Sequence, residues 1–410
     1  MKIGRSGAHL TYCTNIHPGE SWDEVKRHLS RHAVAVKSLV SPDAPFGVGL
    51  RLSAAAAETA SAPNERAALR ELLADAGLYV FTINACPYGA FHGEVVKAAV
   101  YEPDWRTPER QRYTETSADL LADLIEAAPD AHLFGSISSV PGGFRIHRTA
   151  DGFEAMARTL AQTAATLFRM RESGRPLIGL ALEPEPACAF ETTRELTDYL
   201  EAHVFGGTGR QTFARLIGVS AGEAERALRR HVGVCLDACH AAVEFETPEE
   251  GVDLLASAGI SLFKLQVSAG LRIVGPTREK LAALTRFAEG VYLHQTVIRR
   301  GDSLERILDL PHALHRYGSV RDEDLGDEWR VHFHVPIFRA ELGPFESTND
   351  FLGRLLARAA KKSITSHYEV ETYTFDVLPE EYRGEPVETA VARELTWARN
   401  ALDEQDAHLP

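Results

Sequence analysis

Residues 234–240 have the sequence VCLDACH, which indicates a short buried strand followed at once by an acid and a histidine. An aspartate and a histidine at a strand end supply half of the ligands that a metal site needs. Asp237 alone is weak evidence, because an aspartate in this position commonly caps the following helix. Several other predicted strands also end in polar side chains, and their combination favours the metal-binding interpretation.

Short apolar runs alternate with helical stretches along the chain. The predicted strands span about 9–16, 46–52, 78–84, 133–138, 177–183, 232–237, 262–267 and 366–374. The predicted helices span about 21–41, 54–76, 108–128, 152–173, 191–203, 222–231 and 247–258. Repeated strand–helix units favour a parallel sheet covered by helices. Eight strands make a (β/α)8 TIM barrel the simplest fold, and a doubly wound open sheet is the alternative.

The alternation becomes irregular before the last predicted strand. Residues 291–297 and 304–310 suggest a hairpin-like excursion, and residues 331–336 form another β-type run. We therefore expect residues 1–410 to form a single TIM-barrel domain with an elaborated insertion at about 270–360, after the seventh strand. Residues 206–210 (GGTGR) lack the spacing of a phosphate-binding loop, so we predict an exposed glycine-rich turn there.

Composition limits the possible partners. The formal net charge of −14 disfavours a surface that binds nucleic acid. The opening residues lack the apolar run of a signal peptide, and no apolar segment has membrane-spanning length, so we expect a cytoplasmic protein without direct membrane insertion. Five cysteines without regular spacing indicate reduced thiols rather than a disulfide framework.

The two-residue period of a strand predicts which side chains share the barrel interior. At the C-terminal rim, where active sites of such barrels lie, it brings together Glu183, Asp237, Gln266 and Glu371. Taken one at a time, each of these four residues can be explained by an ordinary structural role, such as a helix cap, a solvated turn or an interior hydrogen bond. Several unpaired carboxylates inside a barrel would repel one another unless a cation compensates them. The sequence therefore predicts one divalent metal held by these four residues.

Further polar side chains are candidates for additional metal or substrate binding. They are His240, His332, His334, Lys264, Arg51, Asn84, Asn15 and His17. His332 and His334 share one face of their run and could equally be core histidines. The oxygen-rich ligand set suits Mn²⁺, Mg²⁺ or Co²⁺, whereas histidine ligands would favour Zn²⁺ or Fe²⁺.

Four motifs resemble the metal-bearing strand ends of the xylose isomerase-like TIM barrels. They are residues 181–184 (ALEP), 236–240 (LDACH), 264–268 (KLQVS) and 369–372 (EVET). The whole chain is more closely similar to the EboE family, TIM-barrel proteins of the bacterial ebo gene cluster that are usually described as metabolite traffic proteins. The segments that carry this similarity are 9–20 (HLTYCTNIHPGE), 79–84 (YVFTIN), 87–93 (PYGAFHG), 182–186 (LEPEP) and 332–336 (HFHVP).

The resemblance implies a metal-binding barrel in a pathway that makes or moves a small metabolite. In epimerase-like relatives, two glutamates bind the metal and exchange protons with the substrate, and the matching residues here are Glu183 and Glu371. Asp237 and His240 match the Asp-x-x-His pair of those relatives. Gln266 stands where they commonly have His, Glu or Asn, which leaves the metal's identity open.

Three functional classes follow. The first is a metal-dependent isomerase, epimerase or dehydratase acting on a small polyhydroxylated carbonyl compound, with Lys264, His240 and Arg51 as candidates for orienting its oxygens. The second is a non-catalytic protein that binds or delivers a metabolite. The third, an endonuclease IV-like phosphodiesterase, is disfavoured by the acidic charge. We also expect residues 87–93 to form a lid or wall over the pocket, and the insertion is compatible with a homo-oligomer.

Overall fold

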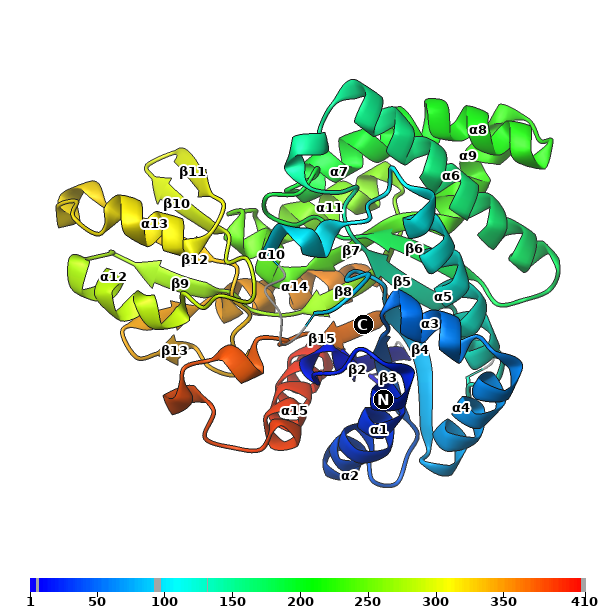
Figure 1. Ribbon diagram of the computed structural model, residues 1–410, viewed down its shortest axis with the longest axis horizontal. Helices are drawn as coiled ribbons and strands as arrows, with labels where there is room; N and C mark the ends of the chain where they lie inside the picture. Colours follow the sequence, from blue (N-terminus) through cyan, green and yellow to red (C-terminus); the bar gives the residue numbers. More distant parts are fainter. Residues whose placement is uncertain (5–6, 92–96, 131, 407–410) are drawn as a thin grey trace.

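The computed structural model describes residues 1–4, 7–91, 97–130 and 132–406. Within these residues, parallel strands follow one another in the order β2, β15, β8, β7, β6, β5, β4 and β3 (Figure 1). A parallel bridge between Cys13 and Gly49 links the two outermost strands and closes the ring. The predicted (β/α)8 barrel with an insertion before its last strand is confirmed, and the open doubly wound sheet is wrong.

The strands of the ring are short and buried along their whole length. They are β2 (Ala8–Tyr12), β3 (Phe46–Arg51), β4 (Leu78–Asn84), β5 (Gly135–Ser139), β6 (Ile178–Leu182), β7 (Val232–Asp237), β8 (Leu262–Val267) and β15 (His367–Val370). A short strand, β1 (Lys2–Ile3), pairs antiparallel with β2. Two strands end earlier than predicted, because a 3₁₀ turn at Thr14–Ile16 follows β2 and the chain turns after Val370.

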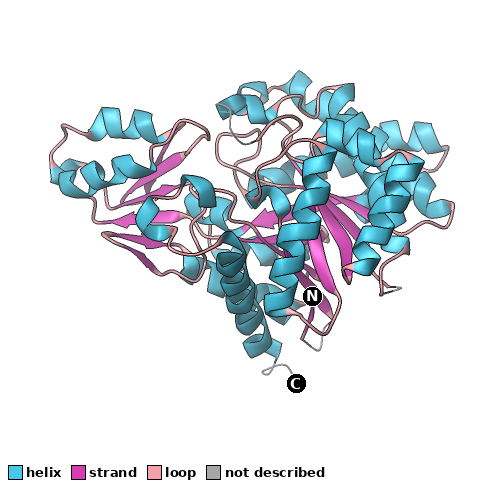
Figure 2. Ribbon diagram, turned by 60° about the horizontal axis from the view of Figure 1, so that its bottom comes forward, coloured by secondary structure: helices cyan, strands magenta, loops and turns pink. Residues whose placement is uncertain are grey.

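Helices cover the outside of the ring (Figure 2). They are α1 (Trp22–His28), α2 (Val34–Val40), α3 (Ala54–Ala60), α4 (Pro63–Asp75), α5 (Pro108–Glu126), α6 (Ala150–Glu172), α7 (Thr193–Tyr199), α8 (Thr208–Ile217), α9 (Ala221–His231), α10 (Ala238–Val243), α11 (Pro248–Ala258), α14 (Asn349–Lys362) and α15 (Val387–Asp406). The predicted glycine-rich turn at 206–210 is wrong in part, because α8 already begins at Thr208.

The segment between β8 and α14 forms a second sheet beside the barrel (Figure 1, left). Its strands are antiparallel and follow the order β11, β10, β12, β9, β14 and β13. The elements are β9 (Leu271–Val274), α12 (Arg278–Leu284), β10 (Thr296–Arg300), β11 (Ser303–Ile307), α13 (Leu310–Tyr317), β12 (Glu328–Val331), β13 (Glu341–Leu342) and β14 (Phe345–Ser347). Residues 332–337, which leave β12, return the chain toward the mouth of the barrel.

Two β-bulges change which side chains fill the barrel. The pairing of β3 with β4 skips Phe81, and the pairing of β7 with β8 skips Phe263. A bulge shifts the alternation of inward and outward side chains by one residue. Phe81 lies 4.8 Å from the ring of His367, and Phe134 stacks on the same ring at 4.0 Å. Aromatic side chains therefore pack around His367 at the start of β15.

Above this aromatic layer lies a buried ion pair between Lys264 of β8 and Glu369 of β15. Lys264 also donates a hydrogen bond to Ser138 Oγ at 3.0 Å. Gly49 makes room for this pair, since a Cβ at that position would overlap the Glu369 carboxylate. The pair thus supports the residues at the C-terminal mouth from below.

Candidate functional site

Four neighbouring strands of the ring present polar side chains at its C-terminal mouth. Asp237 is the last residue of β7, and Gln266 lies opposite it in the register of β8. Glu183 and Glu371 directly follow β6 and β15. One carboxylate oxygen from each of Glu183, Asp237 and Glu371 lies within 4.8 Å of the others. The structure therefore brings the three predicted carboxylates together, with Gln266 adjacent to Asp237.

The carboxylates of Glu371 and Asp237 are held in place by neighbouring donors. Glu371 Oε1 accepts hydrogen bonds from Asn15 Nδ2 at 2.7 Å and from Asn84 Nδ2 at 2.9 Å. Asp237 Oδ1 accepts from the backbone N–H of His240 and from Ser268 Oγ, both at 2.8 Å. Asp237 is therefore the N-cap of α10, which is the common role of an aspartate between a strand and a helix. Its second oxygen, Oδ2, is buried without a hydrogen-bond partner among the described residues, and it is free to bind a ligand.

The electrostatics of this cluster are unfavourable for bare carboxylates. Burial, with the added charges of Glu371 and Asp237, raises the pKa of Glu183 well above its usual range. Burial, followed by the charges of Asp237 and Glu369, raises the pKa of Glu371 in the same way. Lys264 partly offsets both effects, but it is already paired with Glu369. Like charges this close favour protonation or a bound cation.

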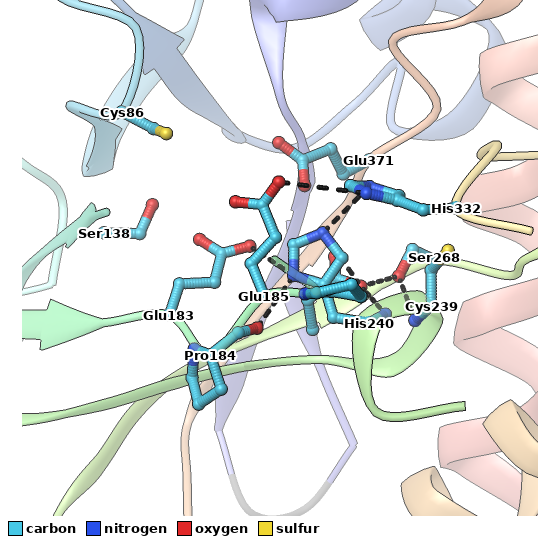
Figure 3. A network of polar contacts seen from close by, with 12 residues as sticks. Cys86, Ser138, Glu183, Pro184, Glu185, Cys239, His240, Ser268, His332 and Glu371 are labelled. Atoms are coloured by element: carbon cyan, nitrogen blue, oxygen red, sulfur yellow. Dashed lines mark hydrogen bonds and ion pairs between the residues drawn. The ribbon is translucent and has the colours of Figure 1, made fainter. Parts of the chain in front are cut away.

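Three histidines, His240, His332 and His334, lie beside the carboxylates. Figure 3 shows two of them, His240 and His332, near Glu183, Glu185 and Glu371. His240 Nδ1 lies 3.0 Å from the carbonyl oxygen of Pro184, and His334 Nδ1 lies 2.7 Å from that of Glu371. His332 Nδ1 lies 2.7 Å from Gln295 Oε1. The Nε2 atoms of His240 and His332 are 3.1 Å apart. Three predicted candidates thus form one cluster next to Asp237.

A cavity opens above the cluster and measures about 660 Å³, including the part that is open to solvent. Glu183, Glu371, His240 and His332 lie on its walls, together with Asn15, Asn84, Cys86, Pro87, Lys97, Tyr101, Ser139, Glu185 and Leu293. Phe91, Tyr292 and Tyr373 pack together along one side, with Phe91 5.1 Å from each of the other two rings.

The predicted lid at 87–93 is partly visible in this arrangement. Pro87 and Phe91 line the cavity, while residues 92 and 93 lie outside the described part of the chain. Arg51 holds the loop from the side, since its guanidinium donates to Gly89 O at 2.5 Å and pairs with Glu20. Arg51 thus links rim segments and is absent from the cavity wall, contrary to its proposed role in orienting substrate.

Lys264 and His17, like His334, do not line the cavity. Lys264 is buried below the mouth in its pair with Glu369, so its predicted contact with substrate oxygens is wrong for this conformation. His17 stacks on His32 at 4.3 Å, and its Nε2 lies 3.1 Å from the hydroxyl of Tyr12. Sequence spacing placed these residues near strand ends, but it could not show which way their side chains point.

Several cavity residues were not predicted from the sequence. Glu185 accepts a hydrogen bond from the Tyr101 hydroxyl at 2.5 Å. Gln295 Nε2 donates to Tyr101 Oη at 2.8 Å and to Pro186 O at 2.9 Å. Glu185 is the second glutamate of the motif LEPEP (residues 182–186), two residues after the predicted ligand Glu183, so the sequence contained a signal for it. Tyr101 ends a 3₁₀ helix (Lys97–Tyr101), whereas Gln295 lies in the loop before β10, so its position depends on the fold of the insertion.

The residues at the mouth suit a divalent cation. Three buried carboxylates converge, and Asp237 Oδ2 and His334 Nε2 lack hydrogen-bond partners among the described residues. Carboxylate oxygens and neutral imidazole nitrogens are common ligands of divalent metals. The fold and site therefore define a (β/α)8-barrel protein with a carboxylate–histidine cluster, suited to metal, at its C-terminal mouth.

Comparisons with known proteins add the following. No family model matches the chain, and no curated protein is significantly similar to it. Among solved structures, it is similar to the probable 3-DHS dehydratase AsbF of Bacillus anthracis (11% identity, 95% of this chain, 97% of that chain, TM-score 0.44). It is also similar to D-psicose 3-epimerase in the presence of D-fructose (11% identity, 96% of this chain, 99% of that chain, TM-score 0.46). A third similar structure is the IOLI protein with a bound zinc atom (10% identity, 97% of this chain, 98% of that chain, TM-score 0.46). Similarity at this level carries no conclusion about shared chemistry.

None of the described helices combines the length and apolar character needed to span a bilayer.

Proposed function

We propose that the protein is a metal-dependent isomerase, epimerase or dehydratase that moves a carbon-bound proton of a small polyhydroxylated carbonyl compound. The observation that carries this proposal is the convergence of Glu183, Asp237 and Glu371, whose carboxylate oxygens lie within 4.8 Å of one another, with Glu183 and Glu371 on the wall of one cavity. A divalent cation bound there would polarise neighbouring substrate oxygens and make an adjacent C–H bond more acidic.

The chain's own residues supply the groups that handle protons. Glu183 and Glu371 both line the cavity and come from strands separated in the ring by β7 and β8. They can therefore approach a bound carbon from different sides, as inversion or dehydration requires. Asn15 and Asn84 fix Glu371 through Oε1, which leaves its other oxygen for metal or substrate.

The class of substrate is supported by two weaker considerations. The sequence resembles xylose isomerase-like barrels and, more closely, the EboE family, whose members are associated with metabolite biosynthesis or traffic. The cavity is walled by carboxylates, amides and imidazoles on one side, which suits hydroxyl groups. We therefore propose a sugar- or cyclitol-like metabolite as the ligand.

Solvent deuterium incorporation tests this proposal. A panel of ketoses and inosose-like ketones is incubated in D₂O with Mn²⁺-loaded protein, and deuterium at carbon is measured by mass spectrometry. We expect metal-dependent incorporation that is lost in Glu371→Gln, whose amide oxygen can still accept from Asn15 and Asn84. Glu341→Gln, the same change at an exposed position of β13, is the matched control and should exchange normally.

The alternative of a metabolite-binding or delivery protein predicts a different result. Such a protein would bind a compound of the panel near the metal, but its deuterium incorporation would equal that of Glu371→Gln. That outcome would reject proton transfer for the compound concerned. Cleavage of an abasic duplex would instead support the endonuclease IV-like class, which the net charge of −14 disfavours.

A further inference from the structure

Lys97 is the single lysine or arginine among the described residues that line the cavity. The other polar groups on the wall are acids, amides, hydroxyls, imidazoles and a thiol. Lys97 begins the 3₁₀ helix Lys97–Tyr101, which lies between β4 and α5. The cavity therefore has one basic side chain on a wall that is otherwise rich in hydrogen-bond acceptors.

The ammonium group of Lys97 is fixed by contacts with the insertion. Its Nζ donates hydrogen bonds to Tyr292 O and to Asp309 Oδ2, both at 2.7 Å. Asp309 is buried, and its Oδ1 accepts from the backbone N–H of His294 at 3.0 Å. A lysine ammonium carries three hydrogens, so one of them has no acceptor among the described residues. Because Lys97 lines the cavity, this hydrogen is available to a ligand.

The backbone of Lys97 has a conformation that lysine rarely adopts. Its φ angle is +40°, in the left-handed region. Phe245 and Ser363 also have positive φ angles, but they follow α10 and α14, where a left-handed residue commonly ends a helix. Lys97 stands at the start of a helix, so this explanation does not apply to it. Strained residues persist where surrounding contacts hold them, and they are concentrated at ligand-binding sites.

The amide donors on the cavity wall are already turned toward a carboxylate. Asn15 and Asn84 both donate to Glu371 Oε1. A hydroxyl group of a ligand can donate to the carboxylates at the strand ends, whereas an anionic oxygen only accepts hydrogen bonds and is repelled by them. Among the described wall residues, Lys97 is thus the one that attracts an anionic group of a ligand.

We propose that the substrate carries an anionic group, a carboxylate or a phosphate, and that Lys97 binds this group while the carbonyl end lies at the strand-end carboxylates. The inference rests on the proposed function, and it narrows the substrate to an acidic or phosphorylated polyhydroxylated carbonyl compound. An ammonium group that is already fixed by Asp309 binds its ligand with little further loss of side-chain freedom. Lys97 is then a specificity-determining residue, and the insertion orients it.

Two matched sets of ketoses test this proposal. The first set is D-fructose, D-fructuronate and D-fructose 6-phosphate, and the second is D-tagatose, D-tagaturonate and D-tagatose 6-phosphate. Within a set, the terminal carbon is a neutral alcohol, a carboxylate or a phosphate ester, so the two anionic members distinguish the two groups. Dissociation constants are measured by calorimetry with full-length, Mg²⁺-loaded protein. We expect an anionic member to bind roughly tenfold or more tightly than its neutral ketose, as one hydrogen bond to a charged group allows.

The variants separate recognition of the anion from a purely structural role of Lys97. Lys97→Gln should lose the preference for the anionic member and bind the neutral ketose as wild type does, whereas loss of a structural contact would weaken both alike. Lys26→Gln is the matched control, because Lys26 pairs with Glu65 at 3.0 Å away from the cavity. Asp309→Asn removes the counter-ion of Lys97 and should increase the preference, which provides a second test if Lys97→Gln does not fold by circular dichroism.

Three results would overturn the inference. They are wild-type protein that binds no anionic member more tightly than its neutral ketose, a preference that Lys97→Gln retains, and a preference that Asp309→Asn leaves unchanged or weakens. Deuterium exchange separates this failure from failure of the proposed reaction. If neutral ketoses exchange in a metal-dependent way while the preference is absent, the proton-transfer function stands without an anionic substrate.

Discussion

Glu394 on α15 should make the stability of the protein depend on pH, and Glu394→Gln should remove that dependence. Its Oε1 accepts hydrogen bonds from Thr372 Oγ1 at 2.7 Å and from the backbone N–H of Ile337 at 3.1 Å. These bonds tie α15 to the residue after Glu371 and to the segment that carries the histidines. A glutamine keeps an acceptor oxygen at the same place, so the substitution changes charge but little else.

The size of the effect follows from the pKa. Burial raises the pKa of Glu394 from 4.5 to about 7, against the opposing hydrogen bond from Thr372. Between these two values the folded protein holds the proton and the unfolded chain has lost it, so stability falls as the pH rises. One pKa unit corresponds to ~1.4 kcal/mol, which gives a loss of about 3 kcal/mol by pH 8. Glu394→Gln should therefore be more stable than wild type by about that amount at pH 8, with a difference that shrinks toward pH 5.

Urea denaturation at pH 5, 6, 7 and 8 measures this difference, with a chelator present so that metal binding does not contribute. Asp403→Asn, a change at an exposed carboxylate on the same helix, should leave the pH dependence of wild type unchanged. A stability difference for Glu394→Gln that is constant across this range, or of opposite sign at pH 8, would refute the reasoning.

Three further predictions concern other parts of the mouth. Lys264→Met leaves Glu369 buried without its partner and should cost roughly 3–5 kcal/mol in urea denaturation, whereas adding Glu369→Gln should restore most of the loss. Asp237→Ala should abolish tight metal retention, measured by mass spectrometry of dialysed protein; full metal occupancy in the variant would contradict the assignment. Phe91→Ala removes the contacts with Tyr292 and Tyr373, so hydrogen exchange of residues 87–91 should accelerate, and unchanged exchange would mean that the ring does not hold this loop.

The barrel and the three carboxylates were predictable because they depend on local pattern. A parallel strand buried on both faces gives a continuous apolar run, and its last inward residue faces the mouth. Asp237 and Glu371 follow that rule. Phe81 and Phe263 do not, because each is an extra residue in a bulge and the sequence has no separate mark for it.

The remaining site residues depend on distant parts of the chain. Gln295 is placed by the insertion sheet, and it fixes the tautomer of His332 from 37 residues away in sequence. Arg51 and Lys264 have the residue types expected for binding substrate oxygens, but each pairs with an acid, Glu20 or Glu369, that sequence spacing did not connect to it. Pairing between charged residues on different elements requires the three-dimensional arrangement.

Charge balance at the mouth depends on how many of its carboxylates are ionised. Lys264 and Glu369 form a pair with no net charge, which leaves Glu183, Asp237, Glu371 and the nearby Glu185 uncompensated by it. One divalent cation would neutralise two ionised carboxylates, and burial, which raises the pKa of Glu183, Glu185 and Glu371, favours protonation of the others. Gln266 is neutral and adds no further charge next to Asp237, so one cation and protonation of the remaining acids are enough to balance the mouth without a basic residue in place of Gln266.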